Sequence, residues 1–167
     1  MQAKLLLLFT TFLFLLLSCS ESKQPMNIYW VRHAEKDLKD TSNNPPLTAK
    51  GRERAIDLRN LLDTQKIAAI YSTSYDRNIQ TVMPLASDQG LDIQSYEANQ
   101  WQTMIDTVPR SFAGKTIIIC GHSNNILPMI QSFGITTERD ELDHEEYGTI
   151  HLLKGINRDP KLVILEY

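Results

Sequence analysis

Short apolar runs alternate with helical periods along most of this 167-residue chain. The clearest run is Ile117-Ile118-Ile119, within residues 115–120. These three isoleucines place apolar side chains on both faces of a strand, so neither face is suited to solvent. Strands that are apolar on both faces are typical of a central parallel sheet covered by helices. Because strands that alternate with helices build βαβ units, the pattern predicts an α/β fold with a mostly parallel sheet.

The other elements of this sheet are predicted from the same two periods. Helical segments place apolar residues at i, i+3, i+4 and i+7, and Thr48 can cap the first of them. The last two strands flank the turn-rich segment 155–160, so they are predicted to pair as a hairpin at an antiparallel edge. The predicted strands are residues 27–31, 67–71, 91–96, 115–120, 149–153 and 162–165, and the predicted helices are 47–62, 79–86, 101–108 and 126–133.

The N-terminal segment resembles the signal of a bacterial lipoprotein. Lys4 precedes an apolar stretch over residues 5–17, which is shorter than the roughly 20 residues that span a bilayer. The stretch ends in Leu-Leu-Ser before Cys19, similar to a lipobox, where the peptide is cut before a cysteine that then carries lipid. The alternative is an ordinary cleaved signal in which this cysteine is incidental.

The lipoprotein interpretation divides the chain into three parts. We expect a signal peptide over residues 1–18, a lipidated tether over 19–26 and a folded domain over 27–167. Several acyl chains on Cys19 would hold the protein stably on a membrane. The expected location is therefore the bacterial cell envelope, facing the periplasm or the exterior.

Charge and cysteine content exclude several kinds of partner. The chain carries 17 basic and 20 acidic residues without a basic block in the sequence, so nucleic acid is not an expected partner. Removal of Lys4 with the leader changes the net charge from −3 to −4, so any anion site must be local. With Cys19 assigned to lipid, Cys120 has no second cysteine, and neither a disulfide framework nor a paired-cysteine metal site is expected.

Residues suited to an anion follow the ends of three predicted parallel strands. Arg32 and His33 follow the first strand, Arg77 lies in the helix after the second, and His122 follows the fourth. Ligands of α/β sheets bind outside the carboxyl ends of the strands. Each residue alone is more often an ordinary surface or core side chain, but four of them at one edge predict an oxyanion site.

A phosphate monoester fits these groups. Two guanidinium groups can bind its oxygens in a bidentate manner, and a protonated histidine can donate one more hydrogen bond. The amides at the start of the helix after Gly121 add partial positive charge. One neutral imidazole is left to attack phosphorus, while the fixed cations stabilise the charge that spreads over the equatorial oxygens.

Four stretches resemble the histidine phosphatases, the phosphoglycerate-mutase-like superfamily. They are RHAE at residues 32–35, LTAKG at 47–51, YST at 71–73 followed by Arg77 and then QT, and GHS at 121–123. They come in the family's order and with its spacing. The resemblance implies a three-layer α/β fold, with a mostly parallel central sheet, an antiparallel edge and helices on both faces.

The same resemblance assigns roles within the site. It implies a nucleophile, His33, that becomes phosphohistidine, and it implies neither a metal nor another cofactor. The activity implied is that of a metal-independent phosphatase acting on a phosphate ester or phosphoramidate. The phosphate pocket would consist of Arg32, Arg77, His122 and Ser123, with Ser72 and Thr81 as supporting residues and Gly51 in a helix that packs nearby.

The proton donor for the leaving group is the least defined part of this site. In larger members of the family it comes from a segment after the third strand, often inside an inserted cap. Here that segment is short, so we expect little or no cap, a small single-domain member and hydrolysis in preference to mutase activity. Glu97 is the predicted general acid, with Glu35, Glu145 and Glu146 as alternatives. The substrate would be a phosphorylated small molecule or a phosphorylated macromolecule.

Two other functions fit parts of the sequence. Residues 121–125 approach the Gly-x-Ser-x-Gly turn of serine hydrolases, with Ser123 as the nucleophile and Asp143 and His151 following in the required order. That interpretation places Asn125 where a glycine is needed and leaves both arginines unexplained. The third candidate is a non-catalytic lipoprotein that binds a phosphorylated ligand.

Overall fold

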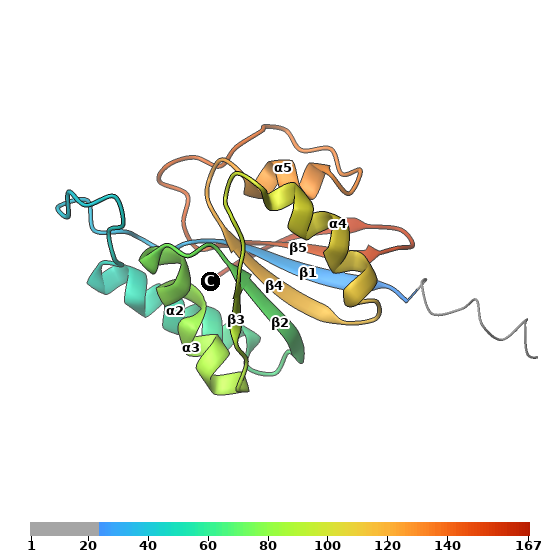
Figure 1. The fold of residues 1–167 in the computed structure, drawn as a ribbon, viewed down its shortest axis with the longest axis horizontal. Helices are drawn as coiled ribbons and strands as arrows, with labels where there is room; N and C mark the ends of the chain where they lie inside the picture. Colours follow the sequence, from blue (N-terminus) through green and yellow to red (C-terminus); the bar gives the residue numbers. More distant parts are fainter. Residues whose placement is uncertain (1–23) are drawn as a thin grey trace, which may run out of the picture.

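A computed structural model describes residues 24–167, and these form a six-stranded sheet with helices on both faces (Figure 1). The predicted signal peptide and Cys19 lie outside the described residues. The elements are β1 (Met26–Arg32), α2 (Ala49–Leu62), β2 (Ile67–Ser72), α3 (Asp76–Gln89), β3 (Ile93–Ser95), α4 (Trp101–Ser111), β4 (Thr116–Gly121), α5 (Ile126–Gln131), β5 (Thr149–Ile156) and β6 (Lys161–Glu166).

The strands lie in the order β3-β2-β4-β1-β5-β6. Strands β1 to β4 run parallel to one another, whereas β5 pairs antiparallel with both β1 and β6. The predicted α/β class, the mostly parallel sheet and the antiparallel hairpin edge are therefore confirmed. The carboxyl ends of β1, β2 and β4 meet at one edge, because Arg32 pairs with Gly121 and Ser72 with Cys120.

Both faces of the sheet are buried, as the continuous apolar run of β4 requires. Alternate residues of β1 point to opposite faces, so Trp30 packs in the core beneath α4 and α5 while Val31 packs in the core beneath α2 and α3. In β4, Ile119 and Ile118 divide between the same two cores. The result is the predicted arrangement of three layers.

Local sequence explains where α2 begins. The Thr48 hydroxyl accepts a hydrogen bond from the Gly51 backbone N–H (3.0 Å), as predicted for an N-cap, and it also donates to the Glu35 carbonyl (3.2 Å). A Cβ at position 51 would collide with the backbone of Glu35. The glycine therefore lets the first turn of α2 lie directly against the loop that follows β1.

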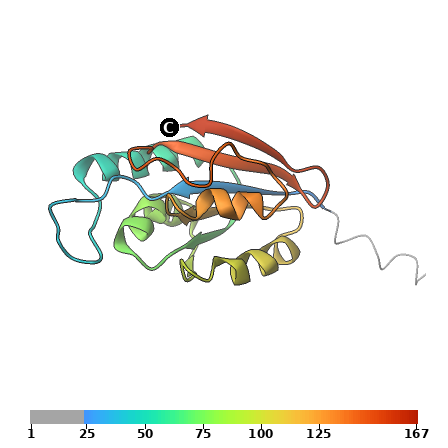
Figure 2. The same ribbon diagram turned by 90° about the horizontal axis from the view of Figure 1, so that it is seen from above.

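The segment between β3 and β4 has no inserted cap. Strand β3 is shorter than the predicted 91–96, and α4 then packs on the sheet through Met104, Ile105 and Val108. The two ends of the sheet differ in the segments that lie there (Figure 2). The loop after β1 projects at one end, and β1 begins at the other, beside the β5–β6 turn. In the part of the chain that the structure describes, no helix is long and apolar enough to cross a membrane.

Candidate active site

His33 is held in one tautomer by its own backbone. The side chain is 4% exposed, and Nδ1 lies 2.9 Å from the carbonyl oxygen of Ala34. Because a carbonyl can only accept, Nδ1 carries the proton of the neutral ring and Nε2 carries the free lone pair. Burial is the largest cause that lowers the pKa of His33, and the nearby charges of His122, Arg32 and Arg77 lower it further, to about 3. The imidazole is therefore neutral and nucleophilic at neutral pH.

His122 lies beside His33 at the end of β4. The two imidazole rings lie edge to face with their centroids 5.5 Å apart, and His122 Nε2 is 3.1 Å from the Thr73 hydroxyl. The backbone N–H of His122 donates to the Asn125 side chain (2.8 Å), which fixes the turn that follows β4. A Cβ at Gly121 would lie 2.6 Å from that same side-chain oxygen, so this turn requires glycine. Burial and the neighbouring cations lower the pKa of His122 to about 4.

Arg32 lies beneath the loop between α5 and β5. Its Nη1 donates to the backbone carbonyls of Asp143 (2.7 Å), His144 (3.0 Å) and Glu146 (3.0 Å). The Tyr147 ring covers the guanidinium group at 4.2 Å. The buried Nε of Arg32 has no hydrogen-bond partner. The Nη1 group thus fixes the loop, while the Nε–H donor remains for an acceptor on a bound ligand.

Arg77 is a second arginine of the cavity that stacks on a tyrosine ring. Its guanidinium carbon lies 4.3 Å from the centre of the Tyr75 ring, and that ring also packs edge to face on His122. The Nε of Arg77 is buried without a hydrogen-bond partner. Two buried guanidinium donors left without acceptors, in one cavity with two neutral imidazoles, are suited to a dianion with several oxygens.

Two side chains of α3 fix the backbone on which these groups stand. Thr81 accepts a hydrogen bond from the Ala34 backbone N–H (2.9 Å) and donates to the Arg77 carbonyl. Asn78 donates to the Gly121 carbonyl at 3.0 Å. The helix therefore connects the residue after the nucleophile with the segment that carries His122. Ser72, by contrast, donates only to the neighbouring Thr73 carbonyl and does not line the site.

These groups open into a cavity of about 670 Å³ at the carboxyl ends of the parallel strands. Its lining includes the two arginines and the two imidazoles, together with Tyr75 and Tyr147. Sequence reasoning gave no role to these tyrosines. The full lining is Arg32, His33, Lys36, Leu38, Tyr75, Arg77, Ala98, His122, Ser123, Asn124, Glu141, His144, Glu145 and Tyr147.

The carboxylates proposed for proton transfer differ in position. Burial alone would raise the pKa of Glu35, but hydrogen bonds from Arg54, with a smaller contribution from Lys50, lower it to about 2, so this group stays ionised. Glu146 is bound to Arg139. Glu97 is exposed and lies outside the cavity that contains the nucleophile, although its neighbour Ala98 lines that cavity.

Two carboxylates of the α5–β5 loop do line the cavity. Glu145 was among the alternatives predicted from the sequence, whereas Glu141 was not. Glu145 lies between the two residues whose carbonyls bind Arg32, His144 and Glu146, so the contact with Arg32 also fixes its backbone. No local sequence signal indicates this, because the loop reaches the site through contacts with a strand more than a hundred residues away.

The three residues of the alternative hydrolase triad are not brought together. Ser123 lines the cavity with His33, but His151 lies within β5 and lines a second cavity that Ser123 does not line. Asp143 pairs instead with Arg139 at 3.3 Å. The geometry therefore gives no support to a serine esterase. Within residues 24–167, no group of three or more His, Cys, Asp or Glu side chains is placed to hold a metal ion.

Comparison with solved structures defines the class of fold. The chain is similar to a phosphoglycerate mutase from Bacillus anthracis (TM-score 0.68, 12% identity, covering 87% of this chain and 94% of that one). It is also similar to an alpha-ribazole phosphatase from Shigella flexneri (TM-score 0.62, 18% identity, 85% and 96%) and to a mycobacterial glucosyl-3-phosphoglycerate phosphatase (TM-score 0.66, 11% identity, 86% and 99%). The fold is therefore phosphoglycerate-mutase-like.

Sequence comparison points to the same superfamily. Residues 28–100 match the family described as histidine phosphatase superfamily (branch 1). The matched segment contains Arg32, His33 and Arg77, and the structure adds His122 beside them. No curated protein sequence matches the chain significantly. The family match and the fold together support the histidine phosphatase superfamily.

Proposed function

We propose that the chain is a phosphatase that works through a phosphohistidine on His33, without a metal. The observation that carries the proposal is the state of this residue. Its ring is neutral, its Nδ1 proton is held by the Ala34 carbonyl, and its Nε2 is the nitrogen left for attack in a cavity lined by two arginines. An imidazole prepared in this way is a competent nucleophile toward phosphorus.

The first step is attack on phosphorus by His33 Nε2. A P–N bond forms as the P–O or P–N bond to the leaving group breaks. Arg32 and Arg77 bind the non-bridging oxygens through donors that have no acceptor in the protein. The negative charge of the phosphoryl group favours the protonated form of His122, which then adds a third cation. Because these groups are already in place, they stabilise the transition state without reorganising.

A poor leaving group needs a proton as it departs. We assign this role to Glu145, which lines the cavity and whose backbone is fixed by the contact between its loop and Arg32. In the first step the carboxyl group of Glu145 gives its proton to the leaving oxygen and becomes the carboxylate. In the second step the Glu145 carboxylate accepts a proton from water, the water oxygen attacks phosphorus, and His33 leaves as a neutral imidazole with release of phosphate.

Hydrolysis is favoured over transfer to a second hydroxyl group. The chain between β3 and β4 contributes only α4, which packs on the sheet and leaves the cavity without a cap from this segment. Water can therefore reach a phosphohistidine at this site. The open cavity fits a phosphate on a small molecule or on the surface of a macromolecule, as an ester or as a phosphoramidate. A phosphoramidate or acyl phosphate leaves easily and would depend little on Glu145.

The experiment uses the chain from Ser20 to Tyr167. All members of the buried core clusters lie between residues 26 and 156, so this segment contains the whole described core. The wild type and His33→Ala are assayed with an aryl phosphate in excess EDTA. Turnover by the wild type alone, together with a trapped phosphohistidine, is the expected result. Equal turnover by both proteins would exclude His33 as the nucleophile, and phosphate binding without turnover would favour a non-catalytic binding protein.

We further propose that the protein is exported and anchored to a membrane of the cell envelope through lipid on Cys19. The support is the sequence of the leader, a short apolar stretch directly before a cysteine. Expression of the full chain with labelled fatty acid tests this proposal. Label in the wild type and its absence in Cys19→Ser are expected, and label in both proteins would contradict it.

A further inference from the structure

A cluster of exposed cations lies at the end of the sheet opposite the cavity. It comes from the segment after α4 and from the β5–β6 hairpin, and we refer to it as the basic edge. Lys115 precedes β4, Lys154 lies near the end of β5, and Lys161 begins β6. The members of the basic edge are Arg110, Lys115, Lys154, Arg158 and Lys161, and all five are exposed.

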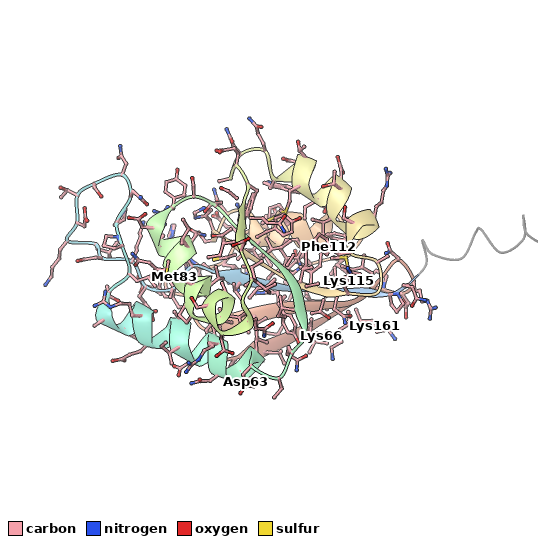
Figure 3. The ribbon with its side chains drawn as sticks, turned by 60° about the horizontal axis from the view of Figure 1, so that its bottom comes forward. Asp63, Lys66, Met83, Phe112, Lys115 and Lys161 are labelled. Carbon is pink, nitrogen blue, oxygen red and sulfur yellow. The ribbon has the colours of Figure 1, made fainter. Side chains whose placement is uncertain are left out.

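Hydrogen bonds hold these segments close to the first residues of β1. The N–H of Asn27 donates to the Lys115 carbonyl (3.0 Å), and the N–H of Gly155 donates to the Asn27 side chain (3.2 Å). The Asn157 side chain contacts the Pro109 carbonyl at 3.5 Å. Figure 3 shows Lys115 and Lys161 on the side of the molecule where β1 begins. The basic edge therefore surrounds the point where residues 1–23 join the fold.

The charge of this edge differs in sign from that of the whole protein. The segments 24–27, 108–116 and 154–161 contain five cations and a single carboxylate, Asp159, which pairs with Lys161 at 3.2 Å. The complete chain has a net charge of −3. Lys66 directly precedes β2, whose first residue pairs with Thr116, and Figure 3 shows it on the same side of the molecule as Lys115 and Lys161. A basic surface on an acidic protein is local, and it is found where the anchor is proposed to attach.

We propose that the basic edge binds the anionic head groups of a membrane, an inference that rests on the lipid anchor proposed at Cys19. Only seven positions separate Cys19 from Met26, so even a fully extended tether keeps this edge within roughly 25 Å of the lipid. At that range the cations enter the field of an anionic surface as the tether relaxes. Each lysine or arginine near such a surface strengthens binding about fivefold.

This contact would fix the orientation of the active site. Strand β1 leads from the basic edge to Arg32 over seven residues, which span about 20 Å. The cavity lies at the far end of that strand and opens away from the bilayer. The substrate would therefore be a phosphorylated molecule that arrives from the aqueous side, and not a lipid phosphate of the membrane that carries the anchor.

Vesicle binding tests the proposal independently of catalysis. The segment Ser20–Tyr167 is sedimented with vesicles of phosphatidylglycerol and phosphatidylcholine, and with vesicles of phosphatidylcholine alone, at low salt. We expect binding to the anionic vesicles only, and its loss as salt is raised. A variant with Arg110→Gln, Lys115→Gln and Lys154→Gln should bind about 100-fold more weakly, at about fivefold for each cation removed.

A matched variant separates this surface from net charge. Lys39→Gln, Lys50→Gln and Arg52→Gln remove three exposed cations at the cavity end of the molecule, so the net charge changes equally. The affinity of this variant for anionic vesicles should stay above one tenth of the wild-type affinity. Equal loss in both variants, or equal wild-type binding to neutral and anionic vesicles, would overturn the proposal. Phosphate release from a soluble aryl ester, measured on the same samples, reports separately on the catalytic proposal.

Discussion

Acidification should destabilise this protein through His33. In the unfolded chain a histidine has a pKa of about 6.5, whereas burial and neighbouring cations lower the pKa of folded His33 to about 3. Between these two values the unfolded state binds more protons than the folded state, so the free energy of unfolding falls as the pH falls. The contribution of neutral His33 is fully present above pH 6.5 and is lost progressively toward pH 3.

The size of the effect at pH 5 follows from the two pKa values. This pH is 1.5 units below the pKa of the unfolded histidine, which is therefore protonated, while folded His33 is still neutral. At 1.36 kcal/mol per unit, the loss is about 2 kcal/mol relative to neutral pH. His33→Asn removes this titration but leaves that of His122, whose pKa is lowered in the same direction.

Urea denaturation at pH 7.5 and pH 5 measures the difference. The wild type should lose about 2 kcal/mol more unfolding free energy between these conditions than His33→Asn. His144→Asn makes the same substitution at an exposed histidine and serves as the matched control. If His33→Asn and the wild type lose the same free energy, then the nucleophile is not buried in a neutral state and the mechanism loses its starting point.

Three further predictions follow from contacts in the site. Glu145→Gln should lower the rate on an alkyl phosphate about 100-fold and leave an aryl phosphate nearly unchanged, whereas Glu97→Gln should change neither; an equal loss on both esters would exclude proton donation. A change from glycine to alanine stabilises most helices, but Gly51→Ala should lower the free energy of unfolding by about 2 kcal/mol in urea denaturation, because the new Cβ meets the Glu35 backbone. An unchanged or raised stability would show that the backbone gives way. Thr81→Val should reduce kcat/KM about tenfold by leaving the N–H after the nucleophile without an acceptor, and unchanged kinetics would show that Thr81 does not position His33.

The sequence was sufficient to predict which strand ends share an edge. Arg32 and His122 follow apolar runs that are predicted as parallel strands, and the structure makes these strands neighbours, with Arg32 paired with Gly121, the residue before His122. These placements depend on hydrophobic period and strand direction, both of which are visible in short windows. The N-cap at Thr48 is local in the same way, and it is confirmed.

The contacts of the α5–β5 loop could not be predicted in this manner. Three carbonyls of this loop bind Arg32, and that contact brings Glu145 to the cavity. A backbone carbonyl has no identity in the sequence, so nothing near residue 145 indicates an arginine partner. The stacking of Tyr75 and Tyr147 on the arginines has the same origin, because ring contacts depend on loop paths and not on period. The position of Glu97 after a strand predicts a place in the site, but the path of the turn leaves this residue outside the cavity.

The partner of His33 Nδ1 is the carbonyl of the next residue, and this has a consequence for how the proposed active site can change. Many catalytic histidines depend on the carboxylate of another residue, which one mutation can delete. Here the acceptor belongs to the peptide chain and is present with any side chain at position 34, so no single substitution there can remove it. The tautomer of His33 is therefore determined by the path of the backbone. Residues around the cavity can vary to suit new phosphorylated substrates while the reacting nitrogen keeps its lone pair.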